Sequence, residues 1–176
     1  MKKNLIVAVL AATSALTMSN AFAAAGIVNF NGEILDAACT VDVSSQNQTV
    51  VLGSYHKSEF STAGDKTAAK KFDIILKDCP TSVIAAKVRF DGQPEMSNEN
   101  LLSIDTSLPG AATGVAINLM TADKSNLPLH GENAYSYALS STQDNTLHFY
   151  AQYQATAVPV QAGPANSVAS FSVIYN

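Results

Sequence analysis

Gly26–Leu35 has the sequence GIVNFNGEIL, in which apolar and polar residues alternate ahead of the first cysteine, Cys39. Alternation of this kind is typical of a β-strand that buries one of its faces. A strand near a chain end can pair inside its own domain, or it can insert into a neighbouring molecule and make the chain a polymer subunit. The alternation alone favours the first arrangement, that of an ordinary first strand.

The first 23 residues have the pattern of a cleaved secretory signal peptide. Lys2 and Lys3 form a positive n-region, Leu5–Leu16 is a short apolar run, and Ala21–Ala23 fits an A-x-A cleavage site. The apolar run is too short for a membrane-spanning helix. We therefore expect an exported chain from which residues 1–23 are removed.

The charge of the remaining chain limits its partners. Loss of Lys2 and Lys3 leaves 8 Lys and Arg against 14 Asp and Glu, without any basic run. An acidic surface argues against nucleic-acid binding and against docking on an anionic membrane. The length fits one domain with a proper hydrophobic core.

Cys39 and Cys79 are the only cysteines. In an oxidising compartment two cysteines are expected to form a disulfide, and only one pairing exists here. A zinc site is the alternative, but two isolated thiols lack the paired spacing of zinc ligands. Closing a loop of 40 residues stabilises a fold by roughly 4 kcal/mol in the chain-entropy model.

Period-two alternation continues along the rest of the chain and predicts several strands. Apolar residues alternate with polar or small ones over residues 71–77, 115–119, 147–154 and 171–175. Residues 61–70 lack an apolar stripe and are predicted to form a loop. Loops are also predicted where Gly, Asn, Asp, Ser and Pro gather, at residues 44–48, 91–100, 109–113, 123–126 and 159–166. The pattern predicts an all-β antiparallel sandwich in a single domain.

No arrangement of residues for catalysis or metal binding is recognisable in the sequence. His56, His130 and His148 follow no ligand spacing and are interpreted as surface residues. There is no G-x-S-x-G motif, and a disulfide would remove both thiols as nucleophiles. Tyr135 and Tyr137 are two residues apart, which favours a same-face pair over a carbohydrate-stacking platform. We expect no catalytic residue, no metal site and no cofactor.

Four stretches and a C-terminal pattern carry a family resemblance. The stretches are Val28–Cys39 (VNFNGEILDAAC), Thr40–Asp42 (TVD), Val50–Gly53 (VVLG) and Phe72–Pro80 (FDIILKDCP). The C-terminal pattern, counted back from Asn176 as the first residue, has tyrosine second, apolar residues fourth, sixth and eighth, and glycine fourteenth. The corresponding residues are Tyr175, Val173, Phe171, Ala169 and Gly163. Together these features resemble the pilin subunits of chaperone–usher fimbriae, and the type 1 fimbrial major subunit group in particular.

The resemblance implies an incomplete immunoglobulin-like β-sandwich that lacks its last strand and carries an N-terminal donor-strand extension. The implied division is a signal peptide over residues 1–23, the extension over 24–36 and the pilin domain over 37–176. The missing strand leaves a groove that exposes core side chains and the edge of the final strand, a state that promotes aggregation.

The resemblance also implies the partners. In the family, a periplasmic fimbrial chaperone lends a strand to the groove, and at the outer-membrane usher the extension of the next subunit replaces it, which is a known form of β-augmentation. The implied partners are this chaperone, the usher and neighbouring fimbrial subunits. The implied location is a cell-surface fimbrium reached through the periplasm.

Residue roles follow from the same resemblance. Val28, Phe30 and Ile34 would enter apolar sockets of a neighbouring subunit, and Gly32 would meet a place too crowded for a side chain. The residues expected to face outward are Asn29, Asn31 and Glu33. The acceptor edge and its motif comprise Gly163, Ala169, Phe171, Val173 and Tyr175. Cys39 and Cys79 would tie the base of the first strand to the body of the domain.

The expected function is that of a structural subunit that polymerises by donor-strand exchange into an adhesive surface fibre. Two related alternatives are a polymeric single-domain adhesin and a minor adaptor or terminator subunit. A small exported β-sandwich enzyme is disfavoured, because no reactive constellation is present.

Overall fold

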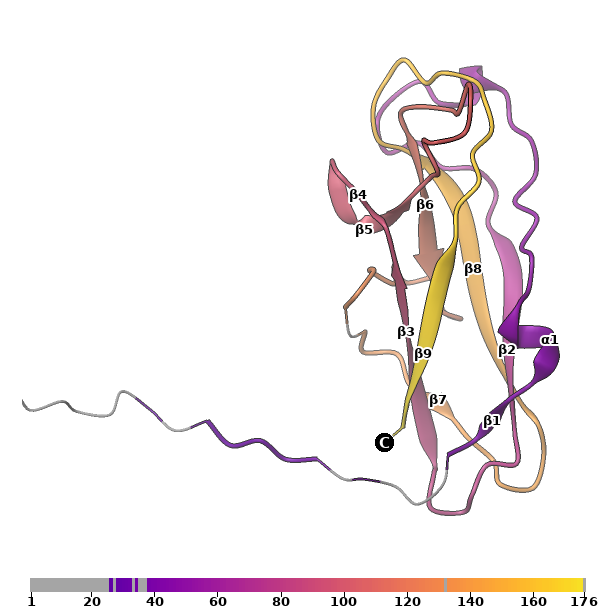
Figure 1. Ribbon diagram of the computed structural model, residues 1–176, viewed down its shortest axis with the longest axis vertical. Helices are drawn as coiled ribbons and strands as arrows, with labels where there is room; N and C mark the ends of the chain where they lie inside the picture. The colour runs from indigo at the N-terminus through magenta and orange to yellow at the C-terminus, as the bar shows by residue number, and fades with distance from the viewer. Residues whose placement is uncertain (1–25, 27, 33, 35–37, 132, 176) are drawn as a thin grey trace, which may run out of the picture. The chain divides into compact units, whose positions relative to one another are not determined.

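The computed structural model describes residues 26, 28–32, 34, 38–131 and 133–175. The chain divides into two units, residues 1–34 and 35–176. All the helices and strands found in the described residues belong to the second unit (Figure 1). None of these helices has the length and apolar character needed to cross a bilayer.

The second unit is built almost entirely from β-strands. Its elements are β1 (Thr40–Val41), α1 (Val43–Gln46), η1 (Lys57–Glu59), β2 (Lys70–Lys77), β3 (Ala85–Gly92), β4 (Pro94–Glu95), β5 (Asn98–Ser103), β6 (Val115–Met120), β7 (Tyr137–Ala138), β8 (Asn145–Ala155) and β9 (Ala169–Tyr175). The strands form two antiparallel sheets, so the predicted all-β class is confirmed.

The larger sheet has the strand order β1-β2-β8-β6-β5-β4. Its centre is the pairing of β2 with β8, in which Phe72 lies opposite Phe149. Because side chains alternate between the two faces of a strand, every second residue of β2 and β8 points into the core. Ile74 of β2 and Leu147 of β8 are accordingly almost completely buried. The predicted strands at residues 71–77, 115–119 and 147–154 are therefore confirmed.

The smaller sheet has the order β7-β3-β9 and contains the predicted C-terminal strand. β3 and β9 pair along their whole length, from Ala86 opposite Tyr175 to Gly92 opposite Ala169. In Figure 1 these two strands lie as one layer in front of β6 and β8. The hydrophobic core lies between the two sheets.

A row of four phenylalanine rings crosses this core from one sheet to the other. Phe72 stacks on Phe149 with ring centroids 5.6 Å apart, and Phe149 meets Phe90 edge to face at 5.4 Å. Phe171 of β9 continues the row, 6.2 Å from Phe90. Aromatic pairs in these geometries stabilise a core beyond their area of contact. The row therefore links β9 to the centre of the domain.

Two predicted loops contain regular structure. Residues 44–48 were predicted to form a loop, but α1 occupies most of this stretch, because the Asp42 side chain accepts a hydrogen bond of 2.9 Å from the Ser44 amide and caps the helix. Residues 91–100 were also predicted to form a loop, but they contain the end of β3 and the short hairpin of β4 and β5. Turn-forming residues are common in short hairpins, so their abundance here led to the prediction of a loop in place of these strands.

The strand predicted at Gly26–Leu35 is not present in the part of this segment that the structure describes. Residues 26, 28–32 and 34 carry no helix or strand assignment, while residues 27, 33 and 35 lie outside the described residues. A β-strand requires hydrogen bonds to a neighbouring strand. No described residue forms a β-bridge with this segment, so the alternation is present without the strand.

Candidate strand-acceptor site

β9 forms one side of the smaller sheet, and its outer edge has no partner strand among the described residues. Asp91 of β3 lies opposite Ser170, and Val88 lies opposite Val173. The Val88 carbonyl points away from β9, where it accepts a hydrogen bond from Asn133. In an antiparallel ladder the opposing residue turns its peptide group the other way, so the peptide groups of Val173 and Phe171 face the outer edge. No backbone hydrogen bond between described residues reaches this edge.

The side chains of β9 show the same lack of a neighbour. The inward-facing residues of β3, Ala86, Val88 and Phe90, are 0%, 1% and 5% exposed. Their partners across the ladder on β9 are Tyr175, Val173 and Phe171, and each is only partly buried against the same core. Paired residues on one face of a sheet contact the same core. The greater exposure of the β9 side chains therefore comes from the side of β9 that has no neighbouring strand. The apolar face of the sandwich is therefore left uncovered where one further strand would fit.

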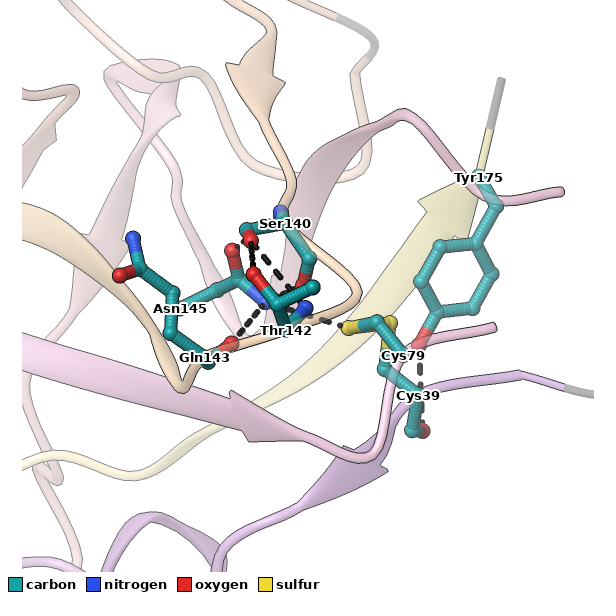
Figure 2. The surroundings of a disulfide bond; sticks show 7 residues. All are labelled: Cys39, Cys79, Ser140, Thr142, Gln143, Asn145 and Tyr175. Carbon is teal, nitrogen blue, oxygen red and sulfur yellow. Dashed lines mark hydrogen bonds between the residues drawn. A yellow bond between two sulfur atoms is a disulfide. The ribbon is translucent and has the colours of Figure 1, made fainter. Parts of the chain in front are cut away.

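The disulfide lies at the end of the domain where β9 finishes. Cys39 and Cys79 are bonded, as expected, with Cα atoms 4.2 Å apart, and they join the start of β1 to the end of β2. The Tyr175 hydroxyl donates a hydrogen bond of 3.3 Å to the Cys39 carbonyl (Figure 2). Burial raises the pKa of this hydroxyl, which therefore stays a donor at neutral pH. This hydrogen bond links the last strand, β9, to the disulfide.

A buried asparagine supports the disulfide from the other side. The Asn145 amide nitrogen lies 3.3 Å from the Cys79 sulfur and 2.9 Å from the Ser140 carbonyl, to which it donates. Its side-chain oxygen accepts a hydrogen bond of 2.7 Å from the Ser140 amide (Figure 2). Because Asn145 opens β8, these contacts tie the central strand of the larger sheet to the disulfide.

A partly open cavity of about 310 Å³ lies beside the stretch that leads into β9. Its lining includes Tyr55, Phe60, Tyr153, Val160 and residues 161–166. Tyr55 and Tyr153 meet edge to face, with centroids 6.1 Å apart. The Tyr153 hydroxyl donates a hydrogen bond of 2.9 Å to the Ala165 carbonyl. Reasoning from the sequence missed this cavity, because its walls come from segments about a hundred residues apart.

Gly163, the most distant member of the C-terminal pattern, belongs to the wall of this cavity. A Cβ atom at Gly163 would clash with the Gly110 carbonyl and would lie 2.6 Å from the Ala112 amide nitrogen. Both neighbours are backbone atoms, which cannot rotate away as side chains do. The position therefore requires glycine, because two stretches of chain cross there at close range.

The described residues of the N-terminal segment present an apolar face. Val28, Phe30 and Ile34 are 74%, 92% and 97% exposed. A Cβ atom at Gly32 would meet nothing within 4 Å. No contact within the described residues therefore requires glycine at this position. Glu33, which was predicted to face outward, lies outside the described residues.

Polar groups near the disulfide form an ion-pair cluster and offer no reactive arrangement. The Lys77 ammonium lies 2.6 Å from an Asp42 carboxylate oxygen and 3.6 Å from one of Asp144. Hydrogen bonding from Lys77 is the main cause that lowers the pKa of Asp42. No set of three or more His, Cys, Asp or Glu side chains within the described residues is placed to hold a metal ion.

The remaining residues singled out from the sequence lie apart from this edge. The rings of Tyr135 and Tyr137 meet edge to face at 4.7 Å and do not present two parallel faces. The His56 side chain caps the short helix η1 by accepting from the Ser58 amide. His130 and His148 each pair with an aspartate, at 2.9 and 2.7 Å.

The two sheets, the disulfide and the uncovered face of β9 define an incomplete immunoglobulin-like β-sandwich, which is the class of fold that pilus subunits adopt. The P pilus rod subunit PapA has the same fold, with a TM-score of 0.67 and 24% identity over 80% of this chain and 100% of that chain. The structure of a chaperone–usher pilus matches with a TM-score of 0.65 and 26% identity, over 86% of this chain and 95% of that chain.

Sequence relatives agree with the fold. The family model for fimbrial proteins matches residues 28–176. The probable major fimbrial subunit LpfA of Escherichia coli O157:H7 is 41% identical over 165 residues, which cover 92% of this chain and 91% of that protein. The type 1 fimbrial subunit of Salmonella typhimurium is 38% identical over 154 residues, covering 85% of this chain and 82% of that protein. The chain belongs to the fimbrial protein family, and it is a structural subunit of a chaperone–usher fimbria, not an enzyme.

Proposed function

We propose that this subunit polymerises by strand addition at β9. In this proposal the segment 28–34 of one subunit inserts along the outer edge of β9 in the next, either in a second copy or in a related subunit. The observation that carries the proposal is the difference in burial between paired residues: Phe90 and Val88 of β3 are covered, whereas Phe171 and Val173 of β9 are not.

The chemistry of the two surfaces supports this pairing. The outer edge of β9 offers unpaired peptide groups, and the segment 28–34 offers peptide groups that no described residue binds in a ladder. Val28, Phe30 and Ile34 supply the apolar side chains that the uncovered face lacks. Burying each of them contributes roughly 1.5–3 kcal/mol. Main-chain hydrogen bonds provide affinity in such strand additions, and alternate side chains provide specificity.

The cavity near Gly163 extends the proposed acceptor site. It lies beside the chain that enters β9, and its lining includes Phe60, Val115 and Val160. An apolar side chain at one end of the inserted segment would find an aromatic and aliphatic socket there. Gly163 allows two backbone segments in the wall of this cavity to approach each other closely.

The uncovered outer edge of β9 is also the reason for the partners and the assembly route that we propose. An uncovered apolar face with free peptide groups aggregates unless another strand covers it. We therefore assign a periplasmic chaperone as the temporary occupant of β9 and an outer-membrane usher as the site where the next subunit replaces it. Removal of residues 1–23 as a signal peptide would leave residues 24–36 as the donor extension and residues 37–176 as the domain, in a cell-surface fimbrium.

The test is a pair of substitutions on opposite faces of the donor segment. Phe30→Asp places a charge where an apolar socket is proposed, whereas Asn31→Asp places the same charge on the outward face. Each variant carries an epitope tag and is expressed with its chaperone, its usher and the untagged subunit. We expect the Phe30→Asp protein to accumulate in the periplasm and to be at least roughly tenfold depleted from purified fibres, because burying an unpaired charge costs several kcal/mol. The Asn31→Asp protein should enter fibres normally. Equal incorporation of both variants would refute the donor role of this face.

A further inference from the structure

The opposite edge of the smaller sheet is closed, although only part of it is covered by a strand. β7 pairs with the start of β3, at Ala85 and Ala86. Beyond Ala86, the outer edge of β3 has no partner strand among the described residues, so six residues of β3 would present a second free edge. A free edge of this kind is a template for strand addition.

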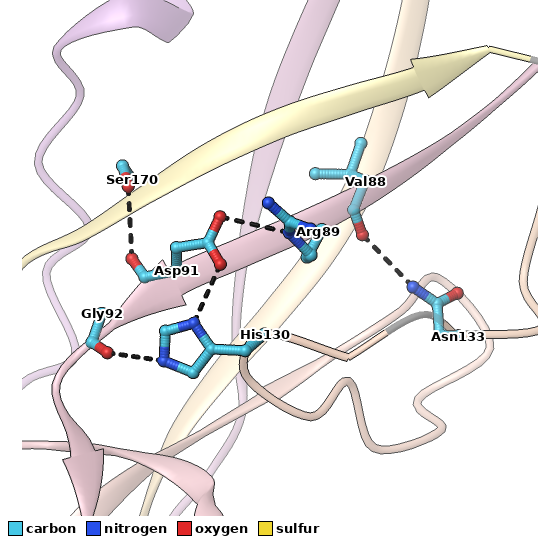
Figure 3. Close-up of polar contacts among 7 residues, drawn as sticks. All are labelled: Val88, Arg89, Asp91, Gly92, His130, Asn133 and Ser170. Atoms are coloured by element: carbon cyan, nitrogen blue, oxygen red, sulfur yellow. Dashed lines mark hydrogen bonds and ion pairs between the residues drawn. The ribbon is translucent and has the colours of Figure 1, made fainter.

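His130 and Asn133 fill that place with hydrogen-bond donors. The Asn133 side-chain amide donates to the Val88 carbonyl at 3.2 Å, and the His130 amide donates to the Phe90 carbonyl at 2.9 Å. The His130 Nε2 atom lies 2.9 Å from the Gly92 carbonyl oxygen (Figure 3). The three carbonyls are two residues apart, so all point to the edge away from β9. His130 also has a φ of 56°, a left-handed conformation that non-glycine residues seldom adopt. These contacts hold it there.

Both nitrogens of the His130 ring face acceptors. Nδ1 lies 2.9 Å from an Asp91 carboxylate oxygen, and Nε2 faces the Gly92 carbonyl. A neutral imidazole carries only one N–H, so both contacts are hydrogen bonds only when the ring holds two protons. Hydrogen bonding from this ring is the main cause that lowers the pKa of Asp91. Arg89 Nε, 3.2 Å from the same carboxylate, is the other charged group of β3 in this cluster, and Glu132 lies outside the described residues.

His148 provides an internal comparison on the other sheet. Its Nδ1 atom lies 2.7 Å from an Asp73 carboxylate oxygen. No hydrogen bond joins its Nε2 atom to another described residue, so a neutral ring already satisfies the pair. Both rings are about half-exposed, and both partners are aspartates of a neighbouring strand. The two pairs therefore differ mainly in the second acceptor, the Gly92 carbonyl.

We propose that His130 and Asn133 act as an edge plug, defined as these two residues on the outer edge of β3, and that the plug confines strand addition to β9. The inference rests on the proposed strand addition at β9. With the β3 edge plugged and the β9 edge open, the smaller sheet accepts an added strand at β9, and the fibre grows without side branches from this sheet.

The experiment combines hydrogen exchange with electron microscopy on fibres of the full chain. The variants are His130→Ala with Asn133→Ala, His130→Gln alone, and His148→Ala as the matched control. Exchange at the amide of residue 130 is resolved by fragmentation, with all variants compared at one pH. The Ala double variant should exchange this amide roughly three- to tenfold faster than wild-type fibres, the range expected when one ordinary hydrogen bond is lost. His130→Gln should fall between the two, and His148→Ala should match the wild type.

Microscopy then tests the role of the plug. Fibres of the Ala double variant should associate side by side or branch, and those of His148→Ala should remain single. If the double variant does not accumulate, His130→Gln is scored in the same way. Single, unbranched fibres with fast exchange would overturn the proposed restriction, and unchanged exchange would overturn the plug itself. Neither result depends on the donor test, since Phe30→Asp reports on entry into fibres and these variants report on fibres already formed.

Discussion

Single residues of the C-terminal pattern owe their identity to contacts that lie far away in the sequence. Gly163 faces the backbone of residues 110–112, more than fifty positions earlier. Tyr175 donates to the Cys39 carbonyl, 136 positions away. The glycine is required because backbone leaves no room for a Cβ atom, and the tyrosine because its hydroxyl has a specific acceptor. The C-terminal pattern therefore depends on contacts between the last part of the chain and residues much earlier in the sequence.

The glycine requirement yields the prediction at this scale. Gly163→Ala should destabilise the domain by about 3 kcal/mol, the upper range for adding a methyl group to a filled space, because its neighbours are backbone atoms. Gly131→Ala is the matched control, since its Cβ would first meet the Pro128 side chain, at 3.2 Å, and should cost less than about 1 kcal/mol. Guanidinium unfolding of purified fibres, followed by circular dichroism, measures both. Similar midpoints for the two variants would contradict the steric requirement.

At the scale of elements, alternation located four strands, missed β3, and could not show which strand lacks a neighbour. β2, β6, β8 and β9 follow from period-two patterns, because one face of each meets the core. β3 has the same pattern but was not predicted as a strand, and Asp91 begins a run of turn-forming residues that masks its end and the hairpin of β4 and β5.

The candidate site was predictable only in part. The pattern ending at Tyr175 names side chains on β9, but the open edge exists because no described segment lies beside that strand, which is a property of the whole topology. The cavity and the edge plug each bring together residues that are distant in the sequence, so no local sequence pattern predicts them. His130 was interpreted as a surface histidine; the structure places it on the surface but gives both ring nitrogens acceptors.

The two faces of β9 provide the element-scale prediction. Phe171 points toward the core and Ser172 points outward, although both belong to the same strand and edge. Phe171→Asp should lower capture by the chaperone and reduce the periplasmic yield at least roughly fivefold, because the charge would lie under the added strand. Ser172→Asp should leave the yield within about twofold, as surface substitutions usually do. Co-purification of each variant with tagged chaperone provides the measurement. Equal capture of the two variants would mean that the inward face of β9 is not the chaperone's binding surface.

At the scale of the whole molecule, five of the described aspartates are stabilised in their charged form. The pKa values of five aspartates are lowered, in each case chiefly by hydrogen bonds that the carboxylate accepts; they are Asp42, Asp65, Asp91, Asp105 and Asp123. Four of these groups close a turn or cap a helix by accepting from a backbone amide nearby, as Asp65 does from Ser61 and Thr62. Loop conformation and carboxylate charge are therefore coupled across the domain.

This coupling predicts a loss of stability in acid. An unfolded aspartate takes up its proton near pH 3.9, and the folded groups do so at lower pH, so between these values the unfolded chain binds more protons. The stabilisation is therefore complete above about pH 5 and is lost as the pH falls through the folded pKa values. Guanidinium midpoints of purified fibres between pH 5.5 and 2.5 should fall steadily below about pH 4.

Asp42→Asn should lower the midpoint at pH 5.5 and flatten the fall, because the Lys77 ammonium loses its charged partner. Asp78→Asn, at a left-handed residue that asparagine also tolerates and that forms no ion pair within the described chain, should behave like the wild type. An unchanged acid profile in Asp42→Asn would show that Asp42 does not contribute to this coupling.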